Sequence, residues 1–216
     1  MVDKVINVLD MIALIGEEAV QDILSDFSCP LNEEIENFVH NNAIDFAKRK
    51  ISVTFLVFNE SGMLSGIFAL THKAIELSAK NMSKETKKKL SRYAHLDEEV
   101  QSYILSAFLI GQLGKNYKDG ADYGIDGDAL MNSAMSKLVS VQHEVGGGVV
   151  YLDCEEKEPL LQFYSNENNR FRRCGEHISK VDNIKRNPVW ASTILKSYSR
   201  NLCTLAGTKT IFGDVT

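Results

Sequence analysis

Two apolar segments separated by an amphipathic one mark the middle of the chain. Tyr103–Ile110 is almost continuously apolar, as is typical of a strand buried on both faces, and Gly148–Cys154 is a second, short strand rich in β-branched residues. Positions 128–144 between them repeat apolar residues at helical spacing. That stripe consists of Met131, Ala134, Met135 and Leu138. The pattern predicts a strand, a helix packed on a sheet, and a second strand beside the first.

A glycine-bearing loop leads into the predicted helix. It runs from Lys118 to Gly127 and contains Gly120 and Gly124. Glycine leaves backbone N–H groups accessible at a helix start, where the helix dipole is positive. The junction therefore predicts a binding site for an anion such as a phosphate.

A short helix with an aromatic pair follows the second strand. Pro159 and the glutamates around it suit the first turn of a helix. Leu160 and Tyr164 are four residues apart and share one face of that helix. We expect Tyr164 to point where Leu160 points, toward the sheet and any cleft in it.

The N-terminal part of the chain predicts a strand and a long helix. Residues 22–28 are expected to form a first strand. Asn32 is a helix cap ahead of an apolar stripe that continues to Phe46 and ends at the basic run 48–50. Residues 5–15 are apolar but too short to span a membrane, so they predict a core helix or a segment that covers a sheet edge.

A hairpin and a polar insert come next. Strands 51–58 and 63–70 flank a turn of sequence Asn-Glu-Ser-Gly. The polar insert covers about 73–100, and Ser83 can cap a lysine-rich helix within it. This helix is either a solvated surface element or a wall on the substrate side whose lysines attract the 3′-phosphate of a cofactor or an RNA backbone.

The pattern is weaker beyond Phe171. Residues 172–178 favour a closing strand, and the chain after about 175 forms an extension. Residues 204–212 favour a further strand or a tail that binds a partner. A helical stripe is also compatible with Trp190, Ile194, Leu195 and Tyr198.

Composition indicates one cytoplasmic domain spanning residues 1–216. A chain of 216 residues with 44% hydrophobic content can bury a full core as a single domain. The net charge of −5 disfavours a general nucleic-acid binder. Four widely spaced cysteines without a Cys-x-x-Cys pair favour free thiols in a reducing compartment. They are Cys29, Cys154, Cys174 and Cys203.

Other common sites are not supported by the sequence. The loop aspartates lack the spacing of an EF-hand, and the five histidines lack the spacing of zinc ligands. No P-loop, dinucleotide fingerprint or Gly-x-Ser-x-Gly elbow is present. We therefore expect no metal and no membrane span.

The order strand, loop, helix, strand, and helix with a Phe-Tyr pair resembles the GNAT superfamily of N-acetyltransferases over roughly residues 20–175. The resemblance implies an α+β fold of three layers, in which helices flank a mixed sheet whose two central strands splay apart. It also implies that acetyl-CoA is the co-substrate and lies in the gap, with its pyrophosphate on the loop at the helix start. The strands ending near Gly114 and Cys154 would form that gap.

The resemblance assigns site residues one by one. In the phosphate loop only Gly127 matches the family pattern squarely, because Asp122 stands in the Gln/Arg place and Ile125 where a glycine belongs. Asp122, Asp126 and Asp128 would repel a pyrophosphate, although solvent screens exposed charges. Phe163–Phe171 looks like the family's Phe-Tyr and Gly-Phe ending with a small insertion. The implied cofactor-binding residues are Leu113, Gly114, Lys115, Gly124, Ile125, Gly127 and Asp128.

The implied reaction is direct transfer of an acetyl group to a primary amine of a small molecule, peptide or protein. Tyr164 is the candidate general acid that protonates the departing thiolate of CoA. The base is open between Glu98, Glu99, His72 and a water chain. Two alternatives remain: a toxin that acetylates aminoacyl-tRNA, although the acidic composition makes nucleic acid an unexpected partner, and a CoA-binding interaction protein without turnover. A homodimer is compatible with either.

Overall fold

The computed structural model describes residues 4–80, 82–118, 124–155, 157–178 and 185–192, with the backbone alone from 174 onward. Eight strands form one sheet: β1 (Lys4–Asn7), β2 (Val53–Phe58), β3 (Leu64–Ser78), β4 (Leu96–Asp97), β5 (Ser102–Lys115), β6 (Val150–Asp153), β7 (Arg172–Ile178) and β8 (Lys185–Ser192). The helices in the described part are α1 (Val8–Ile15), α2 (Glu17–Ser25), α3 (Glu33–Asn41), α4 (Ala43–Lys48), α5 (Lys84–Leu90), α6 (Gly127–Val145) and α7 (Glu158–Ser165).

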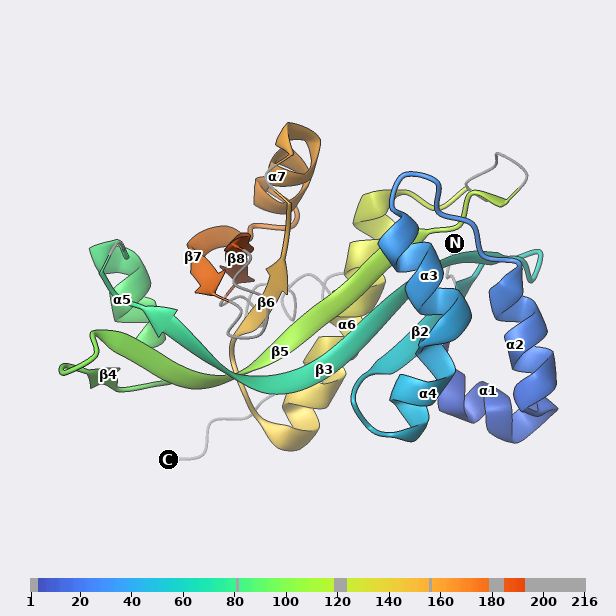
Figure 1. Ribbon diagram of the computed structural model, residues 1–216, viewed down its shortest axis with the longest axis horizontal. Coiled ribbons are helices and arrows are strands. Elements are labelled where there is room, and N and C mark those ends of the chain that lie inside the picture. Colours follow the sequence, from blue (N-terminus) through green and yellow to red (C-terminus); the bar gives the residue numbers. More distant parts are fainter. Residues whose placement is uncertain (1–3, 81, 119–123, 156, 179–184, 193–216) are drawn as a thin grey trace, which may run out of the picture.

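The sheet is mixed. Its strand order is β1-β2-β3-β5-β6-β8-β7, with β4 paired to β5 off this path (Figure 1). β5 and β6 are parallel, whereas the other neighbours are antiparallel. A parallel pair needs a crossover connection, and α6 supplies it. The two parallel strands therefore lie at the centre of the sheet with one helix between them in sequence.

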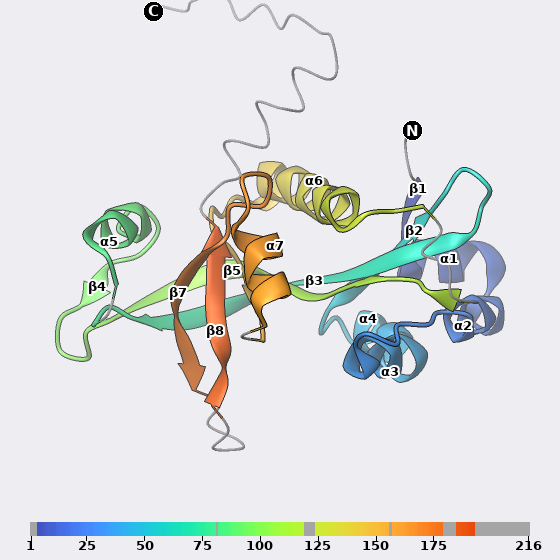
Figure 2. The same cartoon turned by 90° about the horizontal axis from the view of Figure 1, so that it is seen from above.

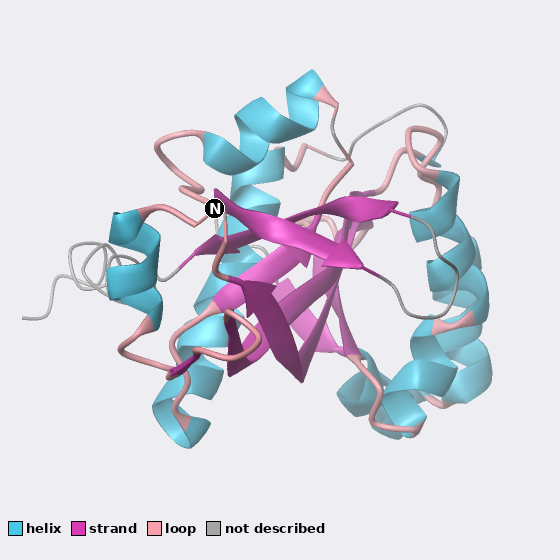
Figure 3. Cartoon of the chain, turned by 60° about the vertical axis from the view of Figure 1, so that its left-hand side comes forward, coloured by secondary structure: helices cyan, strands magenta, loops and turns pink. Residues whose placement is uncertain are grey.

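Helices cover both faces of the sheet, which gives three layers (Figures 2 and 3). Side chains of β3 alternate: Ile67 and Ala69 pack with α1 to α4, whereas Phe68 and Leu70 pack with α6. The predicted stripe of α6 is buried on that second face, and Leu130 joins it. This is the expected α+β fold.

Most of the predicted elements are confirmed. The hairpin 51–58 and 63–70 corresponds to β2 and β3, the strand 148–154 to β6, and the helix 128–144 to α6. Asn32 caps α3, since its side chain accepts hydrogen bonds from the amides of Glu34 and Ile35. Residues 5–15 form both alternatives at once, because β1 pairs along the sheet edge and α1 continues from it.

Three predictions were wrong. Residues 22–28 belong mainly to α2, because Val20 and Leu24 are four residues apart and bury one helical face. The long helix is interrupted at Asn42, which ends α3 and precedes α4. Trp190 lies in strand β8 rather than in a helix. The predicted positions 194–198 and 204–212 lie outside the described residues.

The insert extends the two central antiparallel strands into an arm. β3 continues to Ser78 and pairs with β5 as far as Ser102. This end of the two-stranded ribbon therefore extends past α6, toward α5 (Figure 1). The strand was expected to end near Leu70, but Ile75 and Leu77 alternate with polar residues and are buried. α5 packs on this end of the ribbon, and Ser83 caps it as predicted.

Candidate active site

The two parallel strands separate soon after they meet. β5 and β6 pair in only two rows, the last of which joins Leu109 to Tyr151. β5 then continues beside β3 to Lys115, while β6 ends at Asp153 beside β8. Figure 1 shows the strands diverging toward α7. In the described part of the chain, the facing edges of β5 and β6 have no strand partner beyond Leu109 and Tyr151. The two backbones diverge as a V, and the gap is the space between these two strand edges.

β5 bulges at the start of this gap. Ala69 pairs with Gln112 but Leu70 pairs with Ile110, so Gly111 is an extra residue in β5. Gly111 is exposed although its strand lies inside the sheet. A Cβ added there would find its nearest neighbour 3.9 Å away, which leaves open space beside the strand. The bulge therefore exposes backbone at the place where the two strands part.

The start of α6 offers hydrogen-bond donors. Asp126 caps the helix, and its carboxylate accepts the amide hydrogen of Ala129 over 2.6 Å. The amides of Gly127 and Asp128 have no acceptor among the described residues, as is usual in the first turn of a helix. Two N–H groups at the positive end of the helix dipole are thus available to an anion.

Gly127 has a packing role that the sequence did not reveal. A Cβ at this position would lie 2.9 Å from Cε2 of Phe163 on α7. The absence of a side chain therefore lets α7 approach the start of α6, apart from any approach by a ligand. The backbone at Gly124, three residues earlier, is left-handed with φ +77°, which also favours glycine.

Asp128 is held by the segment that follows α7. Its two carboxylate oxygens accept hydrogen bonds from the side-chain amides of Asn168 (2.6 Å) and Asn169 (3.1 Å). Asn169 is buried and also donates to the carbonyl of Phe163 over 2.8 Å. The negative charge of Asp128 is therefore engaged by amide hydrogens, which reduces its repulsion of an anion at the helix start.

Tyr164 lies where the gap, α7 and the core meet. Its ring makes edge-to-face contacts with Phe163 and Phe171, at centroid distances of 5.0 Å and 6.0 Å. As predicted, Leu160 and Tyr164 both pack against the core on the α6 side. Arg170 ahead of Phe171 has a left-handed backbone with φ 54°, the conformation that a glycine would adopt without strain.

The environment of Tyr164 keeps its hydroxyl protonated. Burial raises the pKa of Tyr164 well above its ordinary value, and repulsion by the negative charge that the neighbouring Cys154 gains when it ionises raises this pKa further. Burial and the adjacent Glu155 also raise the pKa of Cys154, to about 11. Cys154 donates a hydrogen bond to the carbonyl of Glu155 over 3.1 Å. Two neutral proton donors, Cys154 directly after β6 and Tyr164 on α7, are therefore neighbours beside the gap.

The other predicted cofactor residues lie around this gap with different exposures. Leu113 and Ile125 pack into the core beneath α6. Gly114 faces the opposite side, where a Cβ would come within 2.8 Å of Ile35. Lys115 is partly exposed at the end of β5, with Nζ 5.4 Å from the centroid of a tyrosine ring. Asp122 lies outside the described residues.

The candidate bases are separated by the structure. His72 pairs with Phe108 at the base of the gap, and its ring is tilted by 49° against the Phe108 ring at a centroid distance of 4.8 Å. Its Nε2 lies 3.3 Å from Oγ of Ser106. Glu98 and Glu99 lie in the turn after β4, at the tip of the ribbon. Seven strand residues, or about 23 Å, separate the start of β5 from the gap. Only His72 is near the other candidates.

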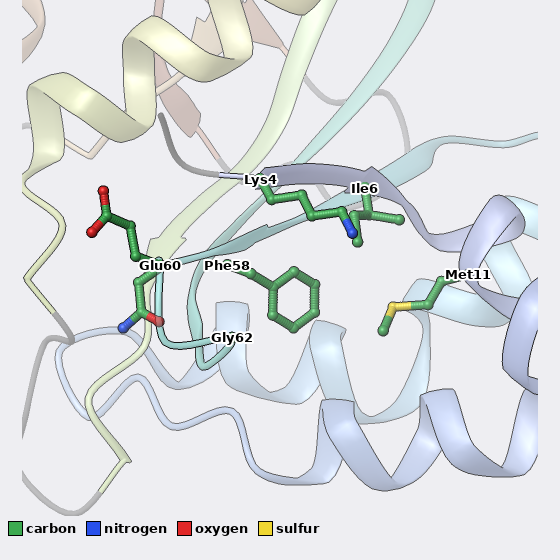
Figure 4. Close-up of a pocket in the computed structure, with 7 residues that line it drawn as sticks. Lys4, Ile6, Met11, Phe58, Glu60 and Gly62 are labelled. Carbon is green, nitrogen blue, oxygen red and sulfur yellow. The ribbon is translucent and has the colours of Figure 1, made fainter. Parts of the chain in front are cut away.

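A pocket of about 410 Å³ lies elsewhere, at the outer edge of the sheet. β1, α1 and the turn between β2 and β3 line it, and Phe58 and Met11 form its apolar side beside Lys4 (Figure 4). Two strands separate this pocket from the gap. It contains none of the predicted site residues.

Two further site types find no support in the described residues. No group of three or more histidine, cysteine or acidic side chains there is arranged to hold a metal ion. None of the helices in that part is both long and apolar enough to cross a membrane.

Comparison with known proteins places the fold. No protein-family model and no curated protein matches the sequence. Solved structures do match: a tyrosine-to-phenylalanine mutant of KacT has a TM-score of 0.60 at 14% identity, covering 93% of this chain and 99% of that chain. AtaT complexed with acetyl-methionyl-tRNAfMet has a TM-score of 0.54 at 16% identity, covering 84% and 91%.

A third similar structure is a tyrosine-to-phenylalanine mutant of the AtaT toxin bound to the C-terminus of the antitoxin AtaR and acetyl-CoA. Its TM-score is 0.51 at 14% identity, with 86% of this chain and 91% of that chain covered. At such identities the likeness concerns the fold alone. The chain has the α+β fold of the GNAT-like N-acyltransferases, with the splayed central strands of that class.

Sequence reasoning missed the partners of the predicted residues more than the residues themselves. The Asn-Glu-Asn-Asn run at 166–169 was interpreted as a small insertion, but it anchors Asp128. Cys154 was interpreted only as a free thiol, yet it lies beside Tyr164. The available signal for the anchoring of Asp128 was the run of four polar residues after an amphipathic helix. The position of Cys154 beside Tyr164 could be recognised only once the end of β6 and α7 were placed in space.

Proposed function

We propose that this protein is an N-acetyltransferase that transfers the acetyl group of acetyl-CoA to a primary amine. The observation that carries the proposal is the gap between β5 and β6, with hydrogen-bond donors at the start of α6 on one side and a protonated Tyr164 on the other. Titration of acetyl-CoA into the protein, followed by a CoA-release assay, tests it.

Each part of acetyl-CoA meets matching chemistry in this arrangement. The pyrophosphate would accept hydrogen bonds from the amides of Gly127 and Asp128 at the positive end of α6. The pantetheine arm carries amides that pair with the unpaired strand edge beyond Leu109, as an added strand would. The exposed backbone at Gly111 lies at the apex, where the thioester would be placed. These fits support acetyl-CoA as the co-substrate.

The chemistry needs one proton at the end of the reaction. A neutral amine attacks the thioester carbonyl, the carbon–sulfur bond breaks, and the sulfur leaves as a thiolate. Tyr164 donates its hydroxyl proton to that sulfur and regains a proton from solvent. Because burial and Cys154 keep this hydroxyl protonated well above neutral pH, the acid form is present at every physiological pH. His72 at the base of the gap is the nearest candidate to receive the proton of the amine.

The Tyr164→Phe variant isolates this role, because it keeps the ring and its contacts and removes only the hydroxyl. We expect kcat to fall by about 10²-fold or more, with acetyl-CoA affinity and melting temperature unchanged. Since the phenol stays protonated, the ratio of the two rates should be constant from pH 6 to 9. Equal rates for both proteins would remove Tyr164 from the mechanism, and a melting temperature that falls while specific activity stays normal would make it a core residue.

A finer second candidate is that the acceptor amine belongs to an aminoacyl-tRNA. The fold likeness to AtaT, solved with acetyl-methionyl-tRNAfMet, favours this acceptor over a small amine. Incubation of the protein with labelled acetyl-CoA and either aminoacylated or deacylated tRNA distinguishes them. Label on aminoacylated tRNA alone supports this candidate, whereas label on small amines alone rejects it.

A further inference from the structure

One segment of the arm, residues 79–95, is basic, whereas the rest of the chain is acidic. Residues 79–95 carry six lysine and arginine residues and one glutamate, a net charge of +5 on a chain whose net charge is −5. The remainder therefore carries −10. The basic residues are Lys80, Lys84, Lys87, Lys88, Lys89 and Arg92. The insert 73–100 as a whole has seven basic and five acidic residues, a net charge of +2, so the positive charge is concentrated in its segment 79–95.

Little of this positive charge is neutralised within the described part of the protein. Glu85 is the single acid of the segment, and it is shared by Lys89 (2.8 Å) and Arg172 (3.2 Å). Lys89 and then Arg172 hold the pKa of Glu85 below its usual range. Lys84, Lys88 and Arg92 are exposed, and none of them has a salt bridge to a described residue.

The acidic run Asp97–Glu99 does not offset this surface. Asp97 ends β4, Glu98 and Glu99 lie in the turn that follows, and Figure 1 shows α5 and β4 on opposite sides of the ribbon end. The carboxylate of Asp97 accepts hydrogen bonds from the amides of Glu99 and Val100 within its own turn. Lys84 and Lys88 share one helical face four residues apart, and Arg92 lies in the turn directly after the C-cap of the helix.

This basic surface is joined to the candidate active site by β7. Phe171 contacts the ring of Tyr164, and its amide donates to the carbonyl of Tyr164 over 2.8 Å. Arg172 is the next residue and reaches Glu85 on α5. The same chain segment thus touches the proposed acid at one residue and the basic helix at the next.

We propose that this arm surface, defined as Lys84, Lys88, Arg92 and Arg172, docks the phosphodiester backbone of a nucleic acid that carries the acceptor amine. The proposal rests on the proposed function, since it names the kind of acceptor that the gap would serve. Tyr93 is 41% exposed directly after Arg92, and His95 is also exposed. Aromatic groups interleaved with basic ones suit stacking on unpaired bases, whereas an acidic protein would not use them in this way.

Phosphate contacts made by this surface would have a measurable salt dependence. If the four residues and Lys87 contact five phosphates of a single strand, log K falls with log salt at a slope of about −3.5. Affinity then falls by about 100-fold between 50 and 200 mM salt. Replacing three of the side chains leaves two contacts and a slope of about −1.4.

The test is fluorescence anisotropy with labelled bulk tRNA. The variant K84Q/K88Q/R92Q removes three exposed charges, and K48Q/R49Q/K50Q at the end of α4 removes the same number elsewhere as a matched control. We expect the arm variant to bind at least tenfold more weakly with a shallower salt slope, and the control to bind like the wild type. Both variants should bind acetyl-CoA normally, because neither set lies in the gap.

Each other outcome counts against the proposal. Equal tRNA binding by the wild type and the arm variant would place the nucleic acid elsewhere on the protein. An equal loss of binding in the control variant would show that the affinity depends only on the net charge of the protein. Competition by polyglutamate as strong as that by RNA would identify an acidic protein as the partner instead. Normal acetyl-CoA binding with no tRNA binding at 50 mM salt would overturn the docking surface while leaving the acetyltransferase intact.

Discussion

Buried proton donors on β6 set the response of the fold to alkaline pH. Burial, with Asp153 adding to it, raises the pKa of Tyr151 from 10.0 to about 12, and burial raises that of Cys154 from 9.0 to about 11. In the unfolded chain both ionise at their ordinary values. The unfolded state therefore loses protons first, so the free energy of unfolding is unaffected below about pH 8 and falls as the pH rises through 9 to 12.

Urea unfolding at pH 8 and pH 10.5 measures this effect. We expect the midpoint of the wild type to drop at the higher pH, and the drop to be smaller in Tyr151→Phe, which has no group to ionise. Tyr93→Phe at an exposed position serves as the control and should behave like the wild type. Identical pH dependence in all three proteins would show that Tyr151 does not contribute.

Gly127 permits two separate tests at the residue scale, because a Cβ there meets the Phe163 ring at 2.9 Å. Gly127→Ala should lower both stability and acetyl-CoA affinity. In the double variant Gly127→Ala/Phe163→Ala the steric conflict is gone. Calorimetry with acetyl-CoA on this double variant and on Phe163→Ala alone therefore shows which of two causes lowers the affinity. Full recovery of affinity would assign the loss to the contact with α7. Continued weak binding would assign it to the approach of the phosphates.

At the scale of elements, the Asp126 cap stabilises the start of α6 but opposes the binding of a phosphate there. The carboxylate of Asp126 satisfies the amide of Ala129, but its charge lies at the proposed phosphate site. Asp126→Asn keeps an acceptor oxygen and removes the charge. We expect stability within about 0.5 kcal/mol of the wild type. Acetyl-CoA affinity should rise, and the gain should shrink at high salt.

Calorimetry at low and high salt checks the Asp126 prediction, with Asp126→Ala as the comparison. The alanine variant loses the cap as well and should cost about 1 kcal/mol of unfolding free energy. Weaker binding by Asp126→Asn at every salt concentration would mean that the carboxylate supports the site rather than opposing it.

Periodicity predicted the elements wherever burial alone decides them. α6, β6 and the hairpin followed from apolar spacing, as did the direction of Tyr164 from Leu160. It failed where tertiary contacts decide. The segment 22–28 contains β-branched and aromatic residues that suit a strand, but α2 forms because its apolar face packs against the other N-terminal helices. The left-handed backbone at Arg170 occurs where the Gly-Phe ending of the resembled family has its glycine, but the arginine itself gives no signal of it.

The candidate site divides in the same way. The helix start at Gly127 and the Phe-Tyr helix could be predicted because each is local in sequence. The hydrogen bonds of Asp128 join residues about 40 positions apart, and the place of Cys154 beside Tyr164 depends on how α7 returns to the sheet. Contacts of this kind come from topology, so one sequence gives no periodic trace of them.

For the whole molecule, the sheet order and the parallel pair β5 and β6 define one gap between diverging strands. The central claim is that this gap is the acetyl-CoA site. Gly111 offers a direct probe, because it is exposed at the apex and an added Cβ meets nothing closer than 3.9 Å. A phenylalanine there should be tolerated by the fold and should block the gap.

The decisive measurement is isothermal titration of acetyl-CoA into the wild type and Gly111→Phe, with melting temperatures recorded for both. We predict one acetyl-CoA bound per wild-type chain, no detectable binding by the variant, and equal melting temperatures. Absence of binding by the wild type, or equal affinity of the two proteins, would contradict the assignment of the gap between β5 and β6 as the acetyl-CoA site.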